Sequence, residues 1–322
     1  MNISIEAVQF VDEAFRQDVL HGLAQTQKAI PCKWFYDEAG SQLFEAITKT
    51  QEYYPTRVET RLLKTVVKEL AELIPDLKVV IEPGSGASVK TRLLLSSQPS
   101  LATYIPIDIS AEFLNGIAQQ LQVDFPHIQV TPLVGDFTQL NIPANLHHET
   151  GSMVFFPGST IGNFSPDEAL ALLKSFHHLA GEDGWLLIGV DSTQNAQQLL
   201  AAYDDSAGIT AAFNKNLLVR ANRELEADFD LAQFAHQARF NQAEGKIEMH
   251  LVSRVAQTVT VAGQPFSFAA GESIFTENCY KYTREIFLAM ANACNWQLAH
   301  VWQDESESEF ELFLLKSSEL AV

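Results

Sequence analysis

The chain has 322 residues, of which 47% are hydrophobic and 10% aromatic, enough for one large domain or two ordinary ones with a sizeable core. Its 40 acidic residues outnumber 21 basic ones and give a net charge of −19, which disfavours nucleic acid and anionic membranes as partners and favours a small-molecule substrate. The three cysteines, Cys32, Cys279 and Cys294, have neither metal-ligand nor disulfide-framework spacing, so we expect no metal site.

The first part of the chain predicts helices joined by aromatic clusters. The sequence shows no signal-peptide pattern, and no uncharged apolar run in it reaches about 18 residues, so we expect a cytoplasmic protein. We also expect a monomer. Phe15, Val19 and Leu23 recur at helical spacing. Two aromatic clusters follow, Lys33-Trp34-Phe35-Tyr36-Asp37 and Glu52-Tyr53-Tyr54-Pro55. Packing is the first interpretation of both, although tyrosines in a loop keep hydroxyl groups available to a ligand.

The next segment, Val79-Val80-Ile81-Glu82-Pro83-Gly84-Ser85-Gly86, predicts a strand that ends in a glycine turn before a helix. Glycines let the backbone approach a ligand, and the first N–H groups of a helix suit a polar or anionic group. The third glycine of a dinucleotide motif and the Gly-Lys-Ser/Thr ending of a phosphate loop are both missing. Glu82 and Asp108 end two consecutive strands and suit a ligand with a cationic group and a ribose diol, as in S-adenosylmethionine. A plain strand-to-helix turn is the alternative.

From about residue 78, apolar runs alternate with helical patterns and predict a parallel sheet with helical crossovers. Five strands are expected near residues 78–82, 103–107, 128–134, 152–157 and 185–190, and two closing strands near 298–302 and 310–315. Ser165-Pro166-Asp167-Glu168 predicts a helix start with a capping box. The loops Gly135-Asp136-Phe137 and Gly158 to Asn163 follow the third and fourth strands, where ligands collect in open α/β sheets.

Residues from about 192 to 282 depart from this alternation, since helical segments are followed by alternating strands such as Ile247-Glu248-Met249-His250-Leu251. We therefore predict an α/β protein whose seven-stranded Rossmann-like core is formed by residues 58–191 and 283–322. Residues 1–57 and 192–282 are expected to form an inserted α+β substrate-binding domain.

Together these motifs resemble the histidine-specific methyltransferases of ergothioneine biosynthesis. The resemblance covers nearly the whole chain and rests on eight blocks: Lys33-Trp34-Phe35-Tyr36-Asp37, Tyr53-Tyr54-Pro55-Thr56-Arg57, Gly84-Ser85-Gly86-x-x-x-Lys90-Thr91, Gly158-Ser159-Thr160-Ile161-Gly162-Asn163, Ala202-Tyr203-Asp204, Ala212-Phe213-Asn214-Lys215-Asn216, Ile247-Glu248-Met249 and Thr276-Glu277-x-x-x-Lys281. It implies a class I methyltransferase core that uses S-adenosylmethionine without a metal. The implied reaction is trimethylation of the α-amine of L-histidine to hercynine.

The resemblance also implies which residues hold the cofactor. Gly84, Lys90, Asp108, Asp136 and Phe137 match the family's cofactor positions. Their chemistry agrees, because a carboxylate such as Asp108 can accept both ribose hydroxyls, and Asp136 with Phe137 can hold the adenine by a hydrogen bond and packing.

A second set of positions is implied for the amino-acid substrate. Tyr53, Asn163 and Tyr203 match positions that grip the carboxylate and amine, with Tyr36 close to the amine, and we expect Asn163 and Tyr36 to orient the amine during catalysis. The positions expected to face the imidazole are those of Glu277, Cys279 and Met249. Cys279 stands where comparable bacterial enzymes carry serine, and a thiol is a poor hydrogen-bond partner.

Three alternative functions stay open at this point. The acceptor could be another aromatic amino acid, such as tryptophan, or a modified histidine. The chain could instead bind histidine and S-adenosylmethionine without catalysis, although the intact Asn163 and tyrosine set disfavours this. A nicotinamide oxidoreductase is disfavoured by the missing third glycine. The nine histidines form no predicted metal or catalytic group, and we assign them no role.

Overall fold

The computed structural model describes residues 4–85, 89–138, 151–304 and 306–318. Its backbone divides into two compact units: unit 1 contains Met1–Tyr53 and Asn195–Cys279, and unit 2 contains Tyr54–Gln194 and Tyr280–Val322. The three crossings from one unit to the other lie four, three and three residues from the boundaries expected at 57/58, 191/192 and 282/283.

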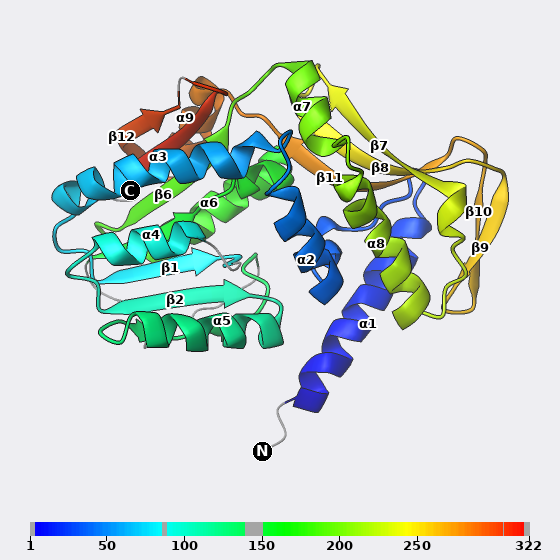
Figure 1. Cartoon of the computed structure of the whole chain (residues 1–322), viewed down its shortest axis with the longest axis horizontal. Helices are drawn as coiled ribbons and strands as arrows, with labels where there is room; N and C mark the ends of the chain where they lie inside the picture. The colour runs from blue at the N-terminus through cyan, green and yellow to red at the C-terminus, as the bar shows by residue number, and fades with distance from the viewer. Residues whose placement is uncertain (1–3, 86–88, 139–150, 305, 319–322) are drawn as a thin grey trace. The chain divides into compact units, whose positions relative to one another are not determined.

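Unit 2 is built on a mostly parallel sheet with the strand order β12-β13-β6-β5-β1-β2-β3 (Figure 1). The bounds are β1 (Val79–Pro83), β2 (Thr103–Asp108), β5 (Ser152–Phe156), β6 (Trp185–Asp191), β12 (Trp296–Gln303) and β13 (Phe310–Ser317). Every residue of β1 and β5 is buried, as expected for parallel strands covered on both faces. The two closing strands are antiparallel, β13 to β6 and β12 to β13.

The third expected strand is wrong in one respect. Residues 128–134 do not form one strand but two short ones, β3 (Gln129–Val130) and β4 (Leu133–Val134), which both pair in parallel with β2. Pro132 lies between them and has no N–H to donate to the ladder, so the strand is interrupted there. The sheet of the described residues therefore has eight strands in place of the expected seven.

In the described part of unit 2, five helices pack around this sheet: α3 (Tyr54–Leu73), α4 (Val89–Ser97), α5 (Ala111–Asp124), α6 (Pro166–Ala180) and α9 (Arg284–Ala293). Figure 1 shows α5 running beside β2. The predicted capping box of α6 is present, with the Glu168 carboxylate accepting the Ser165 N–H at 2.8 Å. Side chains of α6 and α9, among them Phe176 and Phe287, form a buried core with β1, β5, β6 and β13.

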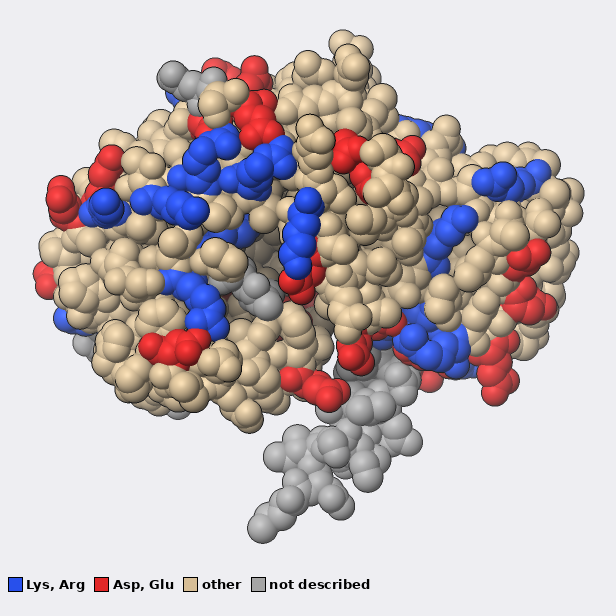
Figure 2. Space-filling model, viewed as in Figure 1, with Lys and Arg blue, Asp and Glu red and all other residues tan. Residues whose placement is uncertain are grey.

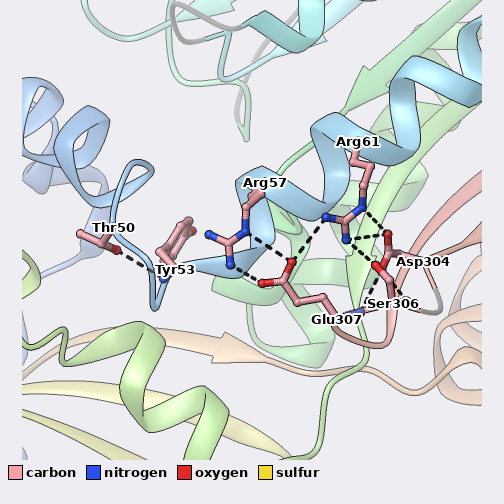
Figure 3. Close-up of polar contacts among 7 residues, drawn as sticks. All are labelled: Thr50, Tyr53, Arg57, Arg61, Asp304, Ser306 and Glu307. Atoms are coloured by element: carbon pink, nitrogen blue, oxygen red, sulfur yellow. Dashed lines mark hydrogen bonds and ion pairs between the residues drawn. The ribbon is translucent and has the colours of Figure 1, made fainter.

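The acidic loop after β12 is held by basic residues of α3. Figure 2 shows lysines and arginines gathered over this helix, where Arg57, Arg61, Lys64 and Lys68 are exposed. Arg57 pairs with Glu307, and a guanidinium nitrogen of Arg61 lies 2.8 Å from the Asp304 carboxylate (Figure 3). Because these side chains are partly exposed, the pairs fix the loop more than they stabilise the fold.

Unit 1 combines helices with a small sheet. Its helices are α1 (Ser4–Leu23), α2 (Glu38–Ile47), α7 (Ala196–Tyr203) and α8 (Ile209–Glu224), with the short 3-10 turns η1 (Cys32–Phe35) and η4 (Leu231–Gln233). Its three-stranded sheet has the order β11 (Ser273–Tyr280), β8 (Lys246–Ser253), β7 (Phe234–Asn241), and β9 (Gln257–Val261) pairs with β10 (Gln264–Phe268) in a hairpin. No helix of the described residues combines the length and the apolar character needed to cross a membrane.

Candidate active site

The glycine turn after β1 brings two predicted cofactor residues together. Gly84 has a φ of +68°, a left-handed conformation that favours glycine, and its N–H donates to the Ile107 carbonyl at 2.8 Å. A Cβ atom on Gly84 would lie 3.2 Å from Cε1 of Phe137, so the Phe137 ring lies against the turn. A flat apolar ring beside an open backbone turn fits the adenosine and amino-acid portions of S-adenosylmethionine. Gly86, the second glycine of the motif, falls outside the described residues.

The two predicted acidic cofactor residues lie at the carboxyl ends of neighbouring strands. Asp108 ends β2, and its carboxylate accepts the Ser110 N–H at 2.8 Å. Burial raises the pKa of Asp108 to about 6, which the hydrogen bonds from Ser110 and Ile109 only partly offset. Asp136 follows β4, and its carboxylate accepts both the N–H and the hydroxyl of Thr138, at 2.9 and 2.6 Å. Each carboxylate is thus oriented by the residues that follow it.

Glu82, the acid that ends the apolar run before the glycine turn, has its oxygens engaged inside the protein. It is 1% exposed and accepts the Tyr104 hydroxyl at 2.7 Å and the Thr91 hydroxyl at 2.8 Å. Burial raises its pKa to about 7 in spite of these hydrogen bonds. Glu82 therefore stabilises the strand end before the turn, because its hydrogen bonds connect β1 to β2 and α4.

Lys90, another predicted cofactor residue, is paired with a carboxylate that the sequence did not single out. Its Nζ lies 2.6 Å from Glu59 of α3, whose side chain is fully buried. The two oxygens of Glu59 also accept the N–H of Gly158, at 2.9 and 2.8 Å. Glu59 thus connects the first turn of α4 to the loop that leads into η3 (Thr160–Asn163) and ends at Asn163.

The η3 loop is also fixed at its start and at its end. Ser159 has a φ of +56°, and its hydroxyl accepts the N–H of Asp191 at 2.9 Å. Phe164, directly after Asn163, lies edge-on to Phe137 with ring centroids 6.1 Å apart. Asn163 itself is partly buried, next in sequence to a ring that contacts the predicted cofactor residue Phe137.

In unit 1, three predicted substrate residues from distant parts of the chain belong to one aromatic cluster. The rings of Tyr53 and Tyr203 are edge-on with centroids 6.4 Å apart. Phe44 joins Tyr53 to Tyr36, with centroid distances of 6.2 and 5.7 Å, and Phe213 lies 5.7 Å from Tyr36. The Thr50 hydroxyl accepts the Tyr53 N–H at 3.3 Å and orients the loop that carries this tyrosine (Figure 3).

The motif in α8 is the scaffold of this cluster. Phe213 stacks on Phe35 with centroids 4.4 Å apart. Asn216 donates to the Asp37 carboxylate at 2.7 Å, and the same carboxylate caps α2 by accepting the Gly40 N–H at 2.8 Å. Because Asp37 follows Tyr36, this network fixes the backbone next to a predicted catalytic residue.

The remaining predicted substrate residues lie on the small sheet of unit 1. Met249 in β8 is 2% exposed, and its carbonyl lies 3.0 Å from the Thr276 hydroxyl of β11. Glu277 and Cys279 are two residues apart in β11, so strand alternation directs both side chains to one face. Cys279 is 3% exposed and Glu277 is partly exposed.

Sequence reasoning missed three polar residues that support the predicted site residues: Glu59, Asn214 and His236. Their partners are far away in the chain, for example 99 residues from Glu59 to Gly158, so no local pattern could reveal them. Asn214 lay within a block quoted for the resemblance, which was the one available signal. Among the described residues, no group of three or more His, Cys, Asp or Glu side chains is arranged to hold a metal ion. His147 and His148 lie outside the described residues.

Comparisons with known proteins identify the family. Residues 15–317 match the family model described as "Histidine-specific methyltransferase, SAM-dependent". The chain is 39% identical over 297 residues to a histidine N-alpha-methyltransferase of Mycolicibacterium smegmatis, covering 91% of this chain and 92% of that protein. It is 38% identical over 301 residues to a protein of the same name from Mycobacterium tuberculosis, covering 91% of this chain and 92% of that one.

Among solved structures, magnesium protoporphyrin IX methyltransferase from Synechocystis PCC 6803 with bound SAH has a TM-score of 0.49 at 12% identity, covering 88% of this chain and 96% of that one. The family match spans nearly all of the sequence and both units. The chain is an enzyme that uses S-adenosylmethionine, and it belongs to the family of histidine-specific methyltransferases.

Proposed function

We propose that the enzyme methylates the α-amine of L-histidine three times and so produces hercynine for ergothioneine biosynthesis. The observation that carries this proposal is the aromatic cluster of unit 1, in which Tyr36, Tyr53 and Tyr203 come together from three parts of the chain. Unit 1 would act as the substrate-binding domain, and unit 2 as the methyltransferase core.

In unit 2, the open turn at Gly84 would receive the methionine portion of the cofactor, with Lys90 near its carboxylate. Asp108 would accept the ribose hydroxyls, while Asp136 and Phe137 would hold the adenine. When bound, S-adenosylmethionine supplies an electrophilic methyl group on a sulfonium sulfur. A sulfonium is cationic, so neutral donors are better suited than an arginine to bind the substrate carboxylate beside it.

The amine must be neutral to react, because an ammonium group has no lone pair. We assign Asn163 and Tyr36 to orient the amine and to favour its uncharged form by hydrogen bonding, while removal of the amine from water disfavours the ammonium form. Before each transfer the ammonium form gives up one proton to become the neutral amine. The transfer then forms a nitrogen–carbon bond and breaks the sulfur–carbon bond of the cofactor, and after the third transfer the nitrogen is quaternary and carries no proton. Alignment of the reacting atoms is the main contribution that the protein makes.

Trimethylation also requires a site that accepts a growing cationic head group. Tyrosine rings suit a quaternary nitrogen through cation–π attraction, and Tyr36, Tyr53 and Tyr203 provide three. Selectivity for imidazole is assigned to Glu277, whose carboxylate can accept a ring N–H, with Cys279 and Met249 as neighbours of the ring.

Product analysis tests this assignment directly. The purified protein is incubated with S-adenosylmethionine and each of the twenty amino acids, and the products are analysed by mass spectrometry. We expect histidine to gain three methyl groups on its α-nitrogen and the other amino acids to stay largely unmodified. Transfer to the imidazole, or a preference for another amino acid such as tryptophan, would contradict the proposal.

Two substitutions separate the roles of the two units. Glu277→Ala should raise KM for histidine and leave the affinity for S-adenosylmethionine near wild type. Asp108→Ala should lower the affinity for S-adenosylmethionine and leave KM for histidine near wild type. Equal loss of both ligands in either variant would argue against its assignment. Cys279→Ser restores a hydroxyl group and should strengthen histidine binding modestly.

We also propose that the enzyme acts as a cytoplasmic monomer. This rests on the net charge of −19, which opposes association between copies of the chain and with anionic surfaces. Native mass spectrometry tests the monomeric state, and cell fractionation tests the cytoplasmic location. A stable dimer at micromolar concentration would contradict the proposed monomer.

A further inference from the structure

The roles assigned above include neither of two buried histidine side chains in unit 1, His236 of β7 and His250 of β8, and His236 is the one that contacts a predicted substrate residue. Its side chain is 2% exposed, and both ring nitrogens have partners. Nε2 lies 2.8 Å from the carbonyl oxygen of Tyr203, and Nδ1 lies 2.8 Å from Nδ2 of Asn214 in α8. Tyr203 is the last residue of α7, so its carbonyl is one of the terminal groups that the helix itself leaves without a partner.

The surrounding hydrogen bonds determine the tautomer of this ring. Nδ2 of Asn214 lies 3.2 Å from the His250 carbonyl, which can only accept, while Oδ1 of Asn214 lies 2.8 Å from the Thr276 hydroxyl. The Asn214 amide is thus oriented with its NH₂ group toward His236. Since both amide hydrogens are donors, Nδ1 of His236 must accept one, and the single ring hydrogen lies on Nε2. That N–H points at the Tyr203 carbonyl.

The charges around the ring agree with a neutral histidine. Burial lowers the pKa of His236. It outweighs the hydrogen bond to the Tyr203 carbonyl and the carboxylates of Asp204 and Asp205, which favour the charged ring, and the positive charge of Lys215 lowers the pKa further. Oδ1 of Asp204 lies 3.8 Å from Nε2. A proton on Nδ1 would also meet the NH₂ group of Asn214.

We propose that His236 is a positioning residue for the amino-acid substrate: its neutral, Nε2-protonated ring, oriented by Asn214, holds the Tyr203 carbonyl and so places the Tyr203 ring beside Tyr53. The role rests on the proposed function, in which Tyr203 contacts the substrate. Without the donor, the end of α7 loses its anchor to β7, and the tyrosine can rotate away from its partner ring.

The same amide extends the support to the strands that carry other substrate residues. The Thr276 hydroxyl, 2.8 Å from Oδ1 of Asn214, is also 3.0 Å from the Met249 carbonyl. Thr276 directly precedes Glu277 in β11. Asn214 therefore connects α8 to β7, β8 and β11, which explains why a polar residue occurs in a helix segment that is otherwise packed against the small sheet.

Two substitutions of similar size distinguish the donor from the acceptor of the ring. His236→Gln places an amide nitrogen near the position of Nε2 and keeps a donor for Tyr203. His236→Asn keeps an acceptor near Nδ1 but has no donor that reaches Tyr203. His127→Asn, at an exposed histidine of unit 2, is the matched control.

We expect His236→Asn to raise KM for histidine about tenfold, as for loss of one buried hydrogen bond, with the dissociation constant of S-adenosylmethionine within about twofold of wild type. His236→Gln should retain most of the histidine affinity, and the control should match wild type. A general structural defect would raise both KM for histidine and the dissociation constant of S-adenosylmethionine. The proposal is overturned if His236→Asn leaves KM for histidine unchanged, or if both His236 variants raise it equally.

A measurement on the wild-type protein covers the case in which a variant does not fold. Nitrogen-15 chemical shifts of the His236 ring should show a protonated Nε2 and an unprotonated Nδ1 at neutral pH. The opposite tautomer or a charged ring would overturn the proposal. This experiment needs no turnover, so it stays informative if the protein fails to methylate histidine, an outcome that would instead reject the proposed function.

Discussion

Asp108 combines a partly buried carboxylate with a pKa of about 6, raised by its burial at the end of β2. In the proposed cofactor site the ionised carboxylate accepts both ribose hydroxyls, so protonation of Asp108 would oppose cofactor binding. We predict that affinity for S-adenosylmethionine falls by up to about tenfold per pH unit below pH 6. Isothermal titration calorimetry between pH 5 and 8 measures this. Asp108→Asn should bind weakly and with little pH dependence, whereas a flat wild-type profile would contradict the assignment.

Glu82 predicts a pH dependence of stability rather than of binding. Its pKa in the folded protein, about 7, is raised by burial above the ordinary value of 4.5. The protonated carboxyl is thus favoured by folding, and its contribution is complete below about pH 4.5 and is lost as the pH rises through 7, at most about 3 kcal/mol. Glu82→Gln cannot ionise. The Tm of this variant minus that of wild type should therefore increase from pH 5 to pH 8, and a constant difference would contradict the prediction.

Individual residues differ in whether the sequence alone can predict their place in the site. Gly84, Asp108 and Phe137 lie at or after strand ends, positions that the alternation of apolar runs reveals, and the resemblance to the methyltransferase family supplies their assignment to the cofactor. Glu59 was not predicted, because an acid within an amphipathic helix has no local sign that it is buried. Its carboxylate is explained only by Lys90 and Gly158, which are 31 and 99 residues away.

At the scale of elements, helix α3 and strand β6 meet where Gly189 leaves room for the carboxylate of Glu59. A Cβ atom on Gly189 would lie 2.3 Å from Oε1 of Glu59. We predict that Gly189→Ala lowers the free energy of unfolding by about 1–3 kcal/mol in wild type, and by less in a Glu59→Ala background. Urea denaturation of the four proteins measures the coupling, and equal costs in both backgrounds would show that the two residues act independently.

Element types were easier to predict than element lengths. The capping box of α6 is confirmed because its bonds are local, within four residues. The expected strand over residues 128–134 is wrong because the interruption at Pro132 outweighs the apolar pattern on either side. Strand β7 was not named, since most of its side chains are only partly buried and show no clear alternation.

For the molecule as a whole, the three chain crossings are tied together inside unit 2. Tyr54, Asp191 and Lys281 lie within three residues of the crossings after residues 53, 194 and 279. The Asp191 carboxylate accepts the Tyr54 hydroxyl at 2.6 Å and the Lys281 ammonium at 2.8 Å, and all three side chains are buried. Gln194 adds a hydrogen bond of 2.9 Å to the Lys281 carbonyl.

Removal of the shared carboxylate should therefore be costly. Asp191→Ala leaves the Lys281 ammonium, whose side chain is 1% exposed, without its anion, and we predict a loss of about 3–5 kcal/mol. Lys316→Met, which breaks an ion pair exposed by 44% and 74%, is the control and should change stability by less than about 1 kcal/mol. Thermal denaturation compares the two variants. Similar losses of stability would show that the buried Asp191 cluster contributes no more to stability than an exposed ion pair does.

The division of unit 1 into two separate stretches of sequence affects how the chain folds during translation. Residues 1–53 supply Trp34 and Phe35, which meet Arg220 and Phe213 of the later stretch. The ribosome makes the 141 residues from 54 to 194 in between, which takes roughly 7–28 s at the usual pace of translation. During that interval the emerging amino-terminal stretch has no finished surface to dock on, so newly made chains should depend on chaperones until the second stretch has left the exit tunnel.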